Sequence, residues 1–289
     1  MMKWIFGLAC ALMSWCALAL QPYVYGTKVT GGDLAAAVAA VEQKLDGAGF
    51  TVIGRHMPKG LPKQATVVVT EPGLTEAAKA IGGTAVAAIP IRIGVKADGT
   101  VSYVNLEYWQ RAYLRKDYGK AEAAVRAAAG KLEQALGTGA AFGGDVPADD
   151  LAKYRYMVMM ERFDSDKTTL TEHKSFDEAV KIVRDNLARG VKGTGKVYEF
   201  VAADKKLAVF GVSLNDPELG EGWWANKIGP DHVAALPWEI FVVNGKVMAL
   251  FGRYRTALAW PSLGMGQFMT IANHPDTTKE MLDAVAGVQ

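Results

Sequence analysis

An internal repeat constrains the fold of this chain more than any other feature of its sequence. Residues 82–95 match residues 229–242 without a gap, most clearly where VAAIP returns as VAALP. Apolar residues then alternate in both copies with the period of a β-strand. The dipeptides Asp98-Gly99 and Asn244-Gly245 follow, and such pairs are the usual signal of a tight hairpin. The sequence therefore predicts two copies of one unit, each with a proline-led β-hairpin.

The repeat also includes a helix upstream of each hairpin. Apolar residues after Asp33 and after Ser175 are spaced by four, three and four positions, which places them on one helical face. Both residue types cap helix N-termini, and Glu178 completes a capping box with Ser175. Strands are expected at 23–29, 50–55 and 66–70 in the first copy and at 154–161, 197–202 and 207–212 in the second, with late helices around 125–136 and 281–285.

The hairpin motifs resemble the domain of unknown function 302 (DUF302) family. The resemblance rests on the Ile-Pro and Leu-Pro strand starts and on the segments 103–109 (YVNLEYW) and 250–254 (LFGRY). Leu106 stands where the family pattern has proline, and the second copy lacks the Asn and Glu of the first. The resemblance implies an α+β fold with two similar domains, each a curved, mainly antiparallel sheet with packed helices. It implies no activity.

The predicted organisation follows from the repeat and from the composition between its copies. We expect a signal peptide at 1–19, a first DUF302-like domain at 20–136, a linker at 137–150 and a second DUF302-like domain at 151–289. The linker begins with a Gly-rich segment whose spacing does not match a phosphate-binding loop.

The N-terminus has the features of a signal peptide. Lys3 precedes an apolar stretch from Trp4 to Leu18 that is short for a membrane span, and small residues lead up to Ala19. We expect cleavage after Ala19 and a periplasmic or secreted protein. An uncleaved membrane anchor is the alternative.

Composition argues against several kinds of chemistry. Cys10 and Cys16 both lie in the predicted signal peptide, so we expect no disulfide or thiolate chemistry in the mature chain. The sequence has 32 Lys and Arg residues against 30 Asp and Glu residues and no basic cluster, which argues against nucleic acid as a partner. We expect no cofactor and no membrane span after signal cleavage, and the oligomeric state is left open.

No familiar catalytic or metal-binding motif appears in the sequence. The histidines stand at no metal-ligand spacing from each other, and no Gly-x-Ser-x-Gly pattern is present. His232, beside Asp231, is the strongest candidate among them. Met157 and Met159 belong to a cluster whose thioethers suit Cu(I), but fillers of a buried strand explain the same pattern, and we favour core packing.

Opposite charges occupy equivalent positions of the repeat. Arg92 aligns with Glu239, which suggests that the copies face one another about an approximate twofold axis and pair these charges. Two unrelated solvated charges explain the alignment at least as well, and we favour them slightly. Arg253, Tyr254 and Arg255 are interpreted as an anchor for an anionic ligand or, preferably, as a solvated strand end.

The preferred function is non-catalytic binding of a small or partly apolar ligand, or of a protein partner, in the cell envelope. The ligand-binding candidates are mainly aromatic and charged residues of the second copy: Arg92, Trp223, Trp224, His232, Trp238, Glu239, Arg253, Tyr254 and Arg255. The alternative is an enzyme in which carboxylates, His232 and residues 253–255 converge on one cleft. A structural or scaffold protein is the third possibility, and it predicts no cavity of ligand size.

Overall fold

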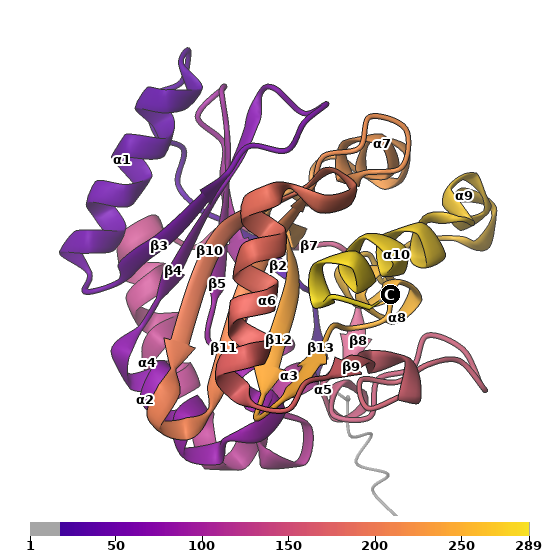
Figure 1. The fold of residues 1–289 in the computed structure, drawn as a ribbon. Helices are drawn as coiled ribbons and strands as arrows, with labels where there is room; N and C mark the ends of the chain where they lie inside the picture. Colours follow the sequence, from indigo (N-terminus) through magenta and orange to yellow (C-terminus); the bar gives the residue numbers. More distant parts are fainter. Residues whose placement is uncertain (1–17, 289) are drawn as a thin grey trace, which may run out of the picture.

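Two antiparallel sheets form the centre of the computed structural model, which describes residues 18–288 (Figure 1). The first sheet has the strand order β3-β4-β5-β6-β2-β7, and the second has the order β10-β11-β12-β13-β9. A separate pair joins β1 (Ala19–Leu20) to β8 (Val146–Pro147). Helices and antiparallel sheets together confirm the α+β class.

The first half contributes β2 (Tyr23–Tyr25), α1 (Leu34–Gly47), β3 (Thr51–His56), β4 (Gln64–Thr70), α2 (Pro72–Ile81), the 3-10 helix η1 (Gly83–Ala88), β5 (Ile91–Lys96), β6 (Val101–Val104), α3 (Leu106–Leu114), η2 (Arg115–Asp117) and α4 (Tyr118–Leu136). The segment between the halves contributes β7 (Ala141–Phe142), β8 and α5 (Ala148–Leu151). The second half contributes η3 (Asp166–Thr168), β9 (Thr169–Glu172), α6 (Phe176–Arg189), η4 (Val191–Gly193), β10 (Thr194–Ala202), η5 (Ala203–Lys205), β11 (Leu207–Leu214), α7 (Glu221–Ile228), η6 (Val233–Ala235), β12 (Trp238–Val243), β13 (Lys246–Met248), α8 (Gly252–Ala259), α9 (Met265–Phe268), η7 (Met269–Ile271) and α10 (His274–Ala286).

The two sheets have the same strand order in their respective halves, apart from the extra strand β7. The repeated hairpins are β5–β6 and β12–β13, and both tight turns use a positive φ, at Gly99 and at Asn244. The predicted N-caps are confirmed, because the Asp33 carboxylate accepts from the backbone of α1 and the Ser175 hydroxyl from that of α6.

The two sheets contact each other through their edge strands β3 and β10, and the inner face of each sheet is also contacted by a 3-10 helix of the other half. Helix α1 covers the outer side of the first sheet, and α6 with α10 covers the outer side of the second (Figure 1). The contacts between the halves are reciprocal, since η1 lies on β11 and β12 while η6 lies on β4, β5 and β6. Such reciprocity is what an approximate twofold relation produces. One hydrophobic core extends through both halves, and the division into two domains stays a prediction.

The strand predicted at 154–161 is wrong. This segment is a loop, in which Val158 is 83% and Met159 91% exposed. The strand that precedes α6 is instead β9, which pairs with β13. Alternating residues form a strand only where a neighbouring strand has free backbone groups. The preference for core packing of Met157 and Met159 is corrected by the same observation.

The predicted linker at 137–150 has structure of its own. Its strand β7 extends the first sheet by pairing with β2, where Tyr23 lies opposite Phe142, and its strand β8 pairs with β1. The predicted signal peptide lies outside the described residues except for its last two. None of the helices within residues 18–288 is long and apolar enough to cross a membrane.

Candidate ligand-binding pocket

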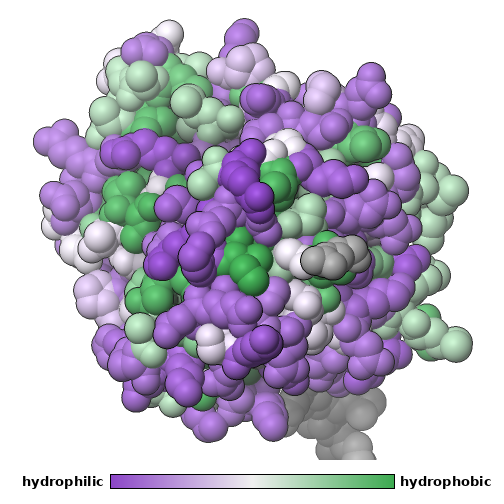
Figure 2. Space-filling model, viewed as in Figure 1, coloured by the Kyte–Doolittle hydropathy of each residue, from purple (hydrophilic) through white to green (hydrophobic). Residues whose placement is uncertain are grey.

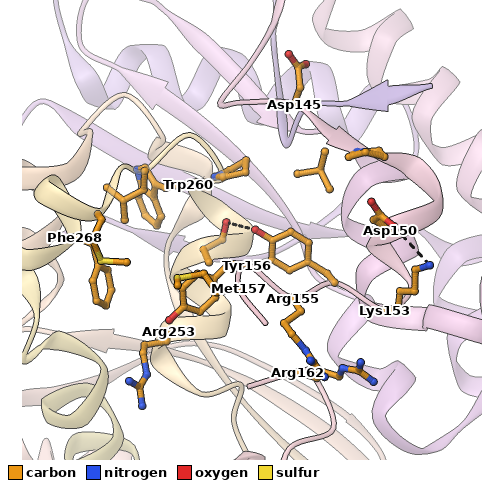
Figure 3. A pocket seen from close by; sticks show the side chains of 17 residues that line it. Asp145, Asp150, Lys153, Arg155, Tyr156, Met157, Arg162, Arg253, Trp260 and Phe268 are labelled. Carbon is orange, nitrogen blue, oxygen red and sulfur yellow. Dashed lines mark hydrogen bonds and ion pairs between the residues drawn. The ribbon is translucent and has the colours of Figure 1, made fainter. Parts of the chain in front are cut away.

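A cavity of about 640 Å³ lies where the segment that joins the halves meets the end of the second half (Figure 3). One wall is formed by β8, α5 and the loop 152–162. The other is formed by α8, the residues 260–264 that follow it, and α9. This volume lies within the range of about 300–1,000 Å³ that is usual for small-molecule sites.

The loop 152–162 is held in place at both ends. The Tyr154 hydroxyl donates to the Ala257 carbonyl of α8 at 2.9 Å. At the other end, the Glu161 carboxylate accepts from Arg253 at 3.0 Å and from Lys167 at 2.8 Å. Burial alone would raise the pKa of Glu161, but the Lys167 hydrogen bond and the Arg253 charge outweigh burial and lower the pKa. Glu161 is therefore ionised at neutral pH and ties the loop to α8.

The apolar lining comes from both walls. Tyr156 and Met157 contribute from the loop, and the opposite side contributes Ala257, Trp260, Pro261, Leu263, Met265 and Phe268. Trp260 is fixed in position, since its indole nitrogen donates to the Gly229 carbonyl at 3.2 Å and its ring meets Trp224 edge to face. This wall is therefore preformed.

Exposed apolar side chains surround the cavity. Met157 and Met265, which line it, are 44% and 55% exposed, and Val158, Met159 and Met269 extend the apolar surface on the same loop and helical turn. In Figure 2 these two regions form the pale green surface along the right edge of the molecule. An apolar surface next to a cavity is typical of ligand sites.

The charged lining is predominantly basic. It contains Lys153, Arg155, Arg162 and Arg253 against Asp145 and Asp150. Lys153 lies 3.7 Å from Asp150, and Arg253 pairs with Glu161. Within residues 18–288, no carboxylate lies within 4.0 Å of the Arg155 or Arg162 guanidinium.

Among the residues predicted to bind a ligand, only Arg253 lines this cavity. Trp223 borders a separate groove of about 440 Å³, where the Lys227 ammonium lies 3.7 Å from its ring centre. Trp224 and Trp238 are fully buried and pack edge to face with each other. Tyr254 is also buried, and its ring packs edge to face with that of Tyr154.

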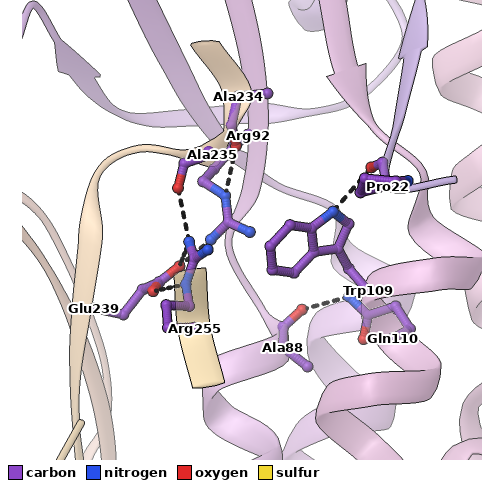
Figure 4. A network of polar contacts seen from close by, with 9 residues as sticks. All are labelled: Pro22, Ala88, Arg92, Trp109, Gln110, Ala234, Ala235, Glu239 and Arg255. Atoms are coloured by element: carbon purple, nitrogen blue, oxygen red, sulfur yellow. Dashed lines mark hydrogen bonds and ion pairs between the residues drawn. The ribbon is translucent and has the colours of Figure 1, made fainter. Parts of the chain in front are cut away.

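The predicted pairing of Arg92 with Glu239 is confirmed (Figure 4). Both side chains are buried where the sheets meet, and Arg255 joins them by donating to Glu239 at 3.1 Å. Both guanidinium groups lie over the Trp109 ring, at 4.6 and 4.8 Å from its centre. The preferred interpretation of 253–255 as a solvated strand end is wrong, because these residues lie on α8 and Arg255 is fully buried.

The residues required for the alternative enzyme site do not converge. His232 stacks on Trp260, and burial lowers its pKa to about 4 despite the Ala259 carbonyl and the Asp231 charge. Asp231 pairs with Lys96, and Glu239 belongs to the buried cluster. In the part of the chain that the structure describes, no group of three or more His, Cys, Asp and Glu side chains is arranged to hold a metal ion.

Sequence reasoning missed most of the cavity. The alternating pattern places Arg155 and Tyr156 on a strand, and no sequence motif marks Arg162, Leu263 or Met265. The available signal was the unusual density of Arg, Tyr and Met in residues 153–162 (KYRYMVMMER), next to a segment without periodicity.

Comparison of the chain with protein-family models, with curated proteins and with solved structures found no match.

Proposed function

We propose that this protein binds a small, partly apolar molecule in the cavity between the loop 152–162 and α9. The observation that carries the proposal is the cavity itself, about 640 Å³ in volume with a preformed wall of aromatic and aliphatic side chains. Sites of this size that combine an apolar wall with polar groups on another side are typical of small-molecule binding.

The same cavity favours binding over the two other functions. A scaffold protein predicts no cavity of ligand size. An enzyme that uses His232 requires Asp231 and Glu239 beside it, whereas Glu239 is enclosed by Arg92 and Arg255 and Asp231 pairs with Lys96.

Filling the cavity tests the proposal. The probe is N-phenyl-1-naphthylamine, an uncharged dye that fluoresces in apolar surroundings. We expect saturable binding to the wild type and at least tenfold weaker binding to Ala257→Trp, whose indole would occupy the cavity. Ala127→Trp, at an exposed position of α4, is the matched control and should bind like the wild type. Unsaturable binding, or equal affinity in Ala257→Trp, would refute the proposal.

The proposal includes a place in the cell envelope and a tandem DUF302-like organisation. The predicted signal peptide supports the first, and the shared strand order of the two sheets supports the second. Intact mass measurement of protein purified from the envelope is expected to give a chain that begins at Leu20. Native mass spectrometry of the same sample would identify a retained ligand. A cytosolic full-length chain would contradict this part of the proposal.

A further inference from the structure

Two arginines of the pocket lack an anionic partner. Arg155 is half-buried, and its Nε is enclosed without a hydrogen-bond partner among the described residues. Arg162 lines the same cavity but is exposed to solvent, and neither guanidinium has a carboxylate within 4.0 Å in residues 18–288. In the view of Figure 3 both side chains lie on the side of the pocket opposite Asp145.

The acidic groups of the lining do not neutralise these arginines. Asp145 accepts a hydrogen bond from Gln21 at 2.8 Å, and Asp150 lies next to Lys153. Glu161 is already shared between Arg253 and Lys167. One side of the cavity therefore carries two positive charges that no carboxylate of the described residues pairs with.

A partly buried guanidinium without a partner is unfavourable, because it has lost water without gaining an equivalent hydrogen bond. An anionic group bound to Arg155 would restore that hydrogen bonding, and the exposed Arg162 would add a second positive charge to the same side of the cavity. The planar guanidinium suits carboxylate, sulfonate and phosphate oxygens. The aromatic and thioether wall would at the same time cover an apolar tail.

We infer that the ligand of this pocket is an anionic amphiphile, with its acidic head group on Arg155 and Arg162 and its single apolar chain against Trp260, Met265 and Phe268. This inference rests on the proposed function and specifies the chemical class of the ligand. The exposed Met157 and Met265 at the edge leave room for a chain to enter.

Matched probes separate the head group from the chain. Dodecanoate and dodecanol share one alkyl chain, and only dodecanoate is charged at pH 8. By displacement of N-phenyl-1-naphthylamine, we expect wild type to bind dodecanoate about 10- to 100-fold more tightly than dodecanol. The variant Arg155→Gln/Arg162→Gln should lose this preference and keep its affinity for dodecanol within about twofold. Arg126→Gln, at an exposed position of α4, is the control and should behave like the wild type.

Chain length provides a second measurement on the folded wild type. Burial of each added methylene is worth up to about a fourfold gain in affinity. From octanoate to dodecanoate, affinity should therefore rise with each methylene.

The outcomes distinguish this inference from the proposed function. Equal binding of dodecanoate and dodecanol, or unchanged dodecanoate binding in the double variant, overturns the inference while the proposed function stands. Failure of both alkyl probes to displace the dye also overturns it. Failure of the dye itself to bind, together with failure of both alkyl chains by calorimetry, removes the proposed function as well.

Discussion

The two halves differ most in the connection between their last two helices. In the first half, α3 passes to α4 through Arg115–Asp117 alone. In the second half, residues 260–273 separate α8 from α10 and include α9. Trp260, Leu263 and Phe268, which line the cavity, all belong to this longer connection. The same scaffold therefore acquires a pocket in one half through a local extension.

The contact between the sheets shows a second difference. Equivalent strand positions hold Arg92 and Glu239, and the second residue after the start of α3 and of α8 is a tyrosine in both halves. The next residue is Trp109 in the first half and Arg255 in the second. Identical charges at these facing positions would repel each other, whereas different side chains permit an ion pair and cation–π contacts. A duplicated chain can hold different residues at these equivalent positions because its two copies mutate independently.

The largest expected effect comes from removing the one carboxylate in this cluster. Glu239→Gln leaves Arg92 and Arg255 buried without a countercharge, so we expect a loss of about 3–5 kcal/mol in the free energy of unfolding, measured by urea titration. Asp185→Asn, in the exposed pair with Lys181, should cost less than about 1 kcal/mol. Equal losses in the two variants would show that the buried cluster contributes nothing specific.

A glycine in the first half tests how closely η6 packs on the first sheet. Gly94 is equivalent to Phe241, and a Cβ at Gly94 would lie 2.7 Å from the Cβ of Val233. We expect Gly94→Ala to destabilise by roughly 1–3 kcal/mol through overpacking. Gly130→Ala, in the exposed part of α4 where an added Cβ meets nothing within 4 Å, should instead stabilise by about 0.5–1 kcal/mol. A stabilising Gly94→Ala would show that η6 can move away from the first sheet without cost.

Acid should weaken the second half through a buried histidine. Burial lowers the pKa of His274 to about 3, while its unfolded value is about 6.5. The folded protein keeps His274 neutral and the unfolded chain protonates it, so stability is present above pH 6.5 and falls as the pH decreases toward 3. Between pH 6 and 5, this histidine should account for about 1.2 kcal/mol. The difference in unfolding free energy between wild type and His274→Gln should shrink by that amount over this interval, and a constant difference would contradict the assignment.

The smallest effect concerns a feature that both halves share. Asp33 and Ser175 cap equivalent helices, so Asp33→Ala and Ser175→Ala should each cost about 1 kcal/mol. Thermal unfolding of both variants measures this. A loss of stability in only one of the two variants would indicate that the two caps share a sequence pattern but do not contribute equally to stability.

Much of the fold is predictable because its signals are local. The hairpins, the helices after Asp33 and Ser175, and the strands β4 and β11 follow from periodicity, turn residues and caps. The residues 154–161 alternate like those of a strand, so the sequence predicts a strand where the structure has a loop. Only the tertiary structure shows that β9 is the strand that pairs with β13.

The sequence by itself determined the repeated scaffold, because hairpins, caps and amphipathic helices are encoded over a few neighbouring residues. It also marked Arg92 and Glu239 as equivalent positions of opposite charge. Tertiary structure alone decided that these two side chains meet in the core and that Arg155, Arg162 and Trp260 share a cavity. The physical reason is that such contacts join residues far apart along the chain, so that neither their burial nor the absence of an ionic partner can be judged before the chain has packed.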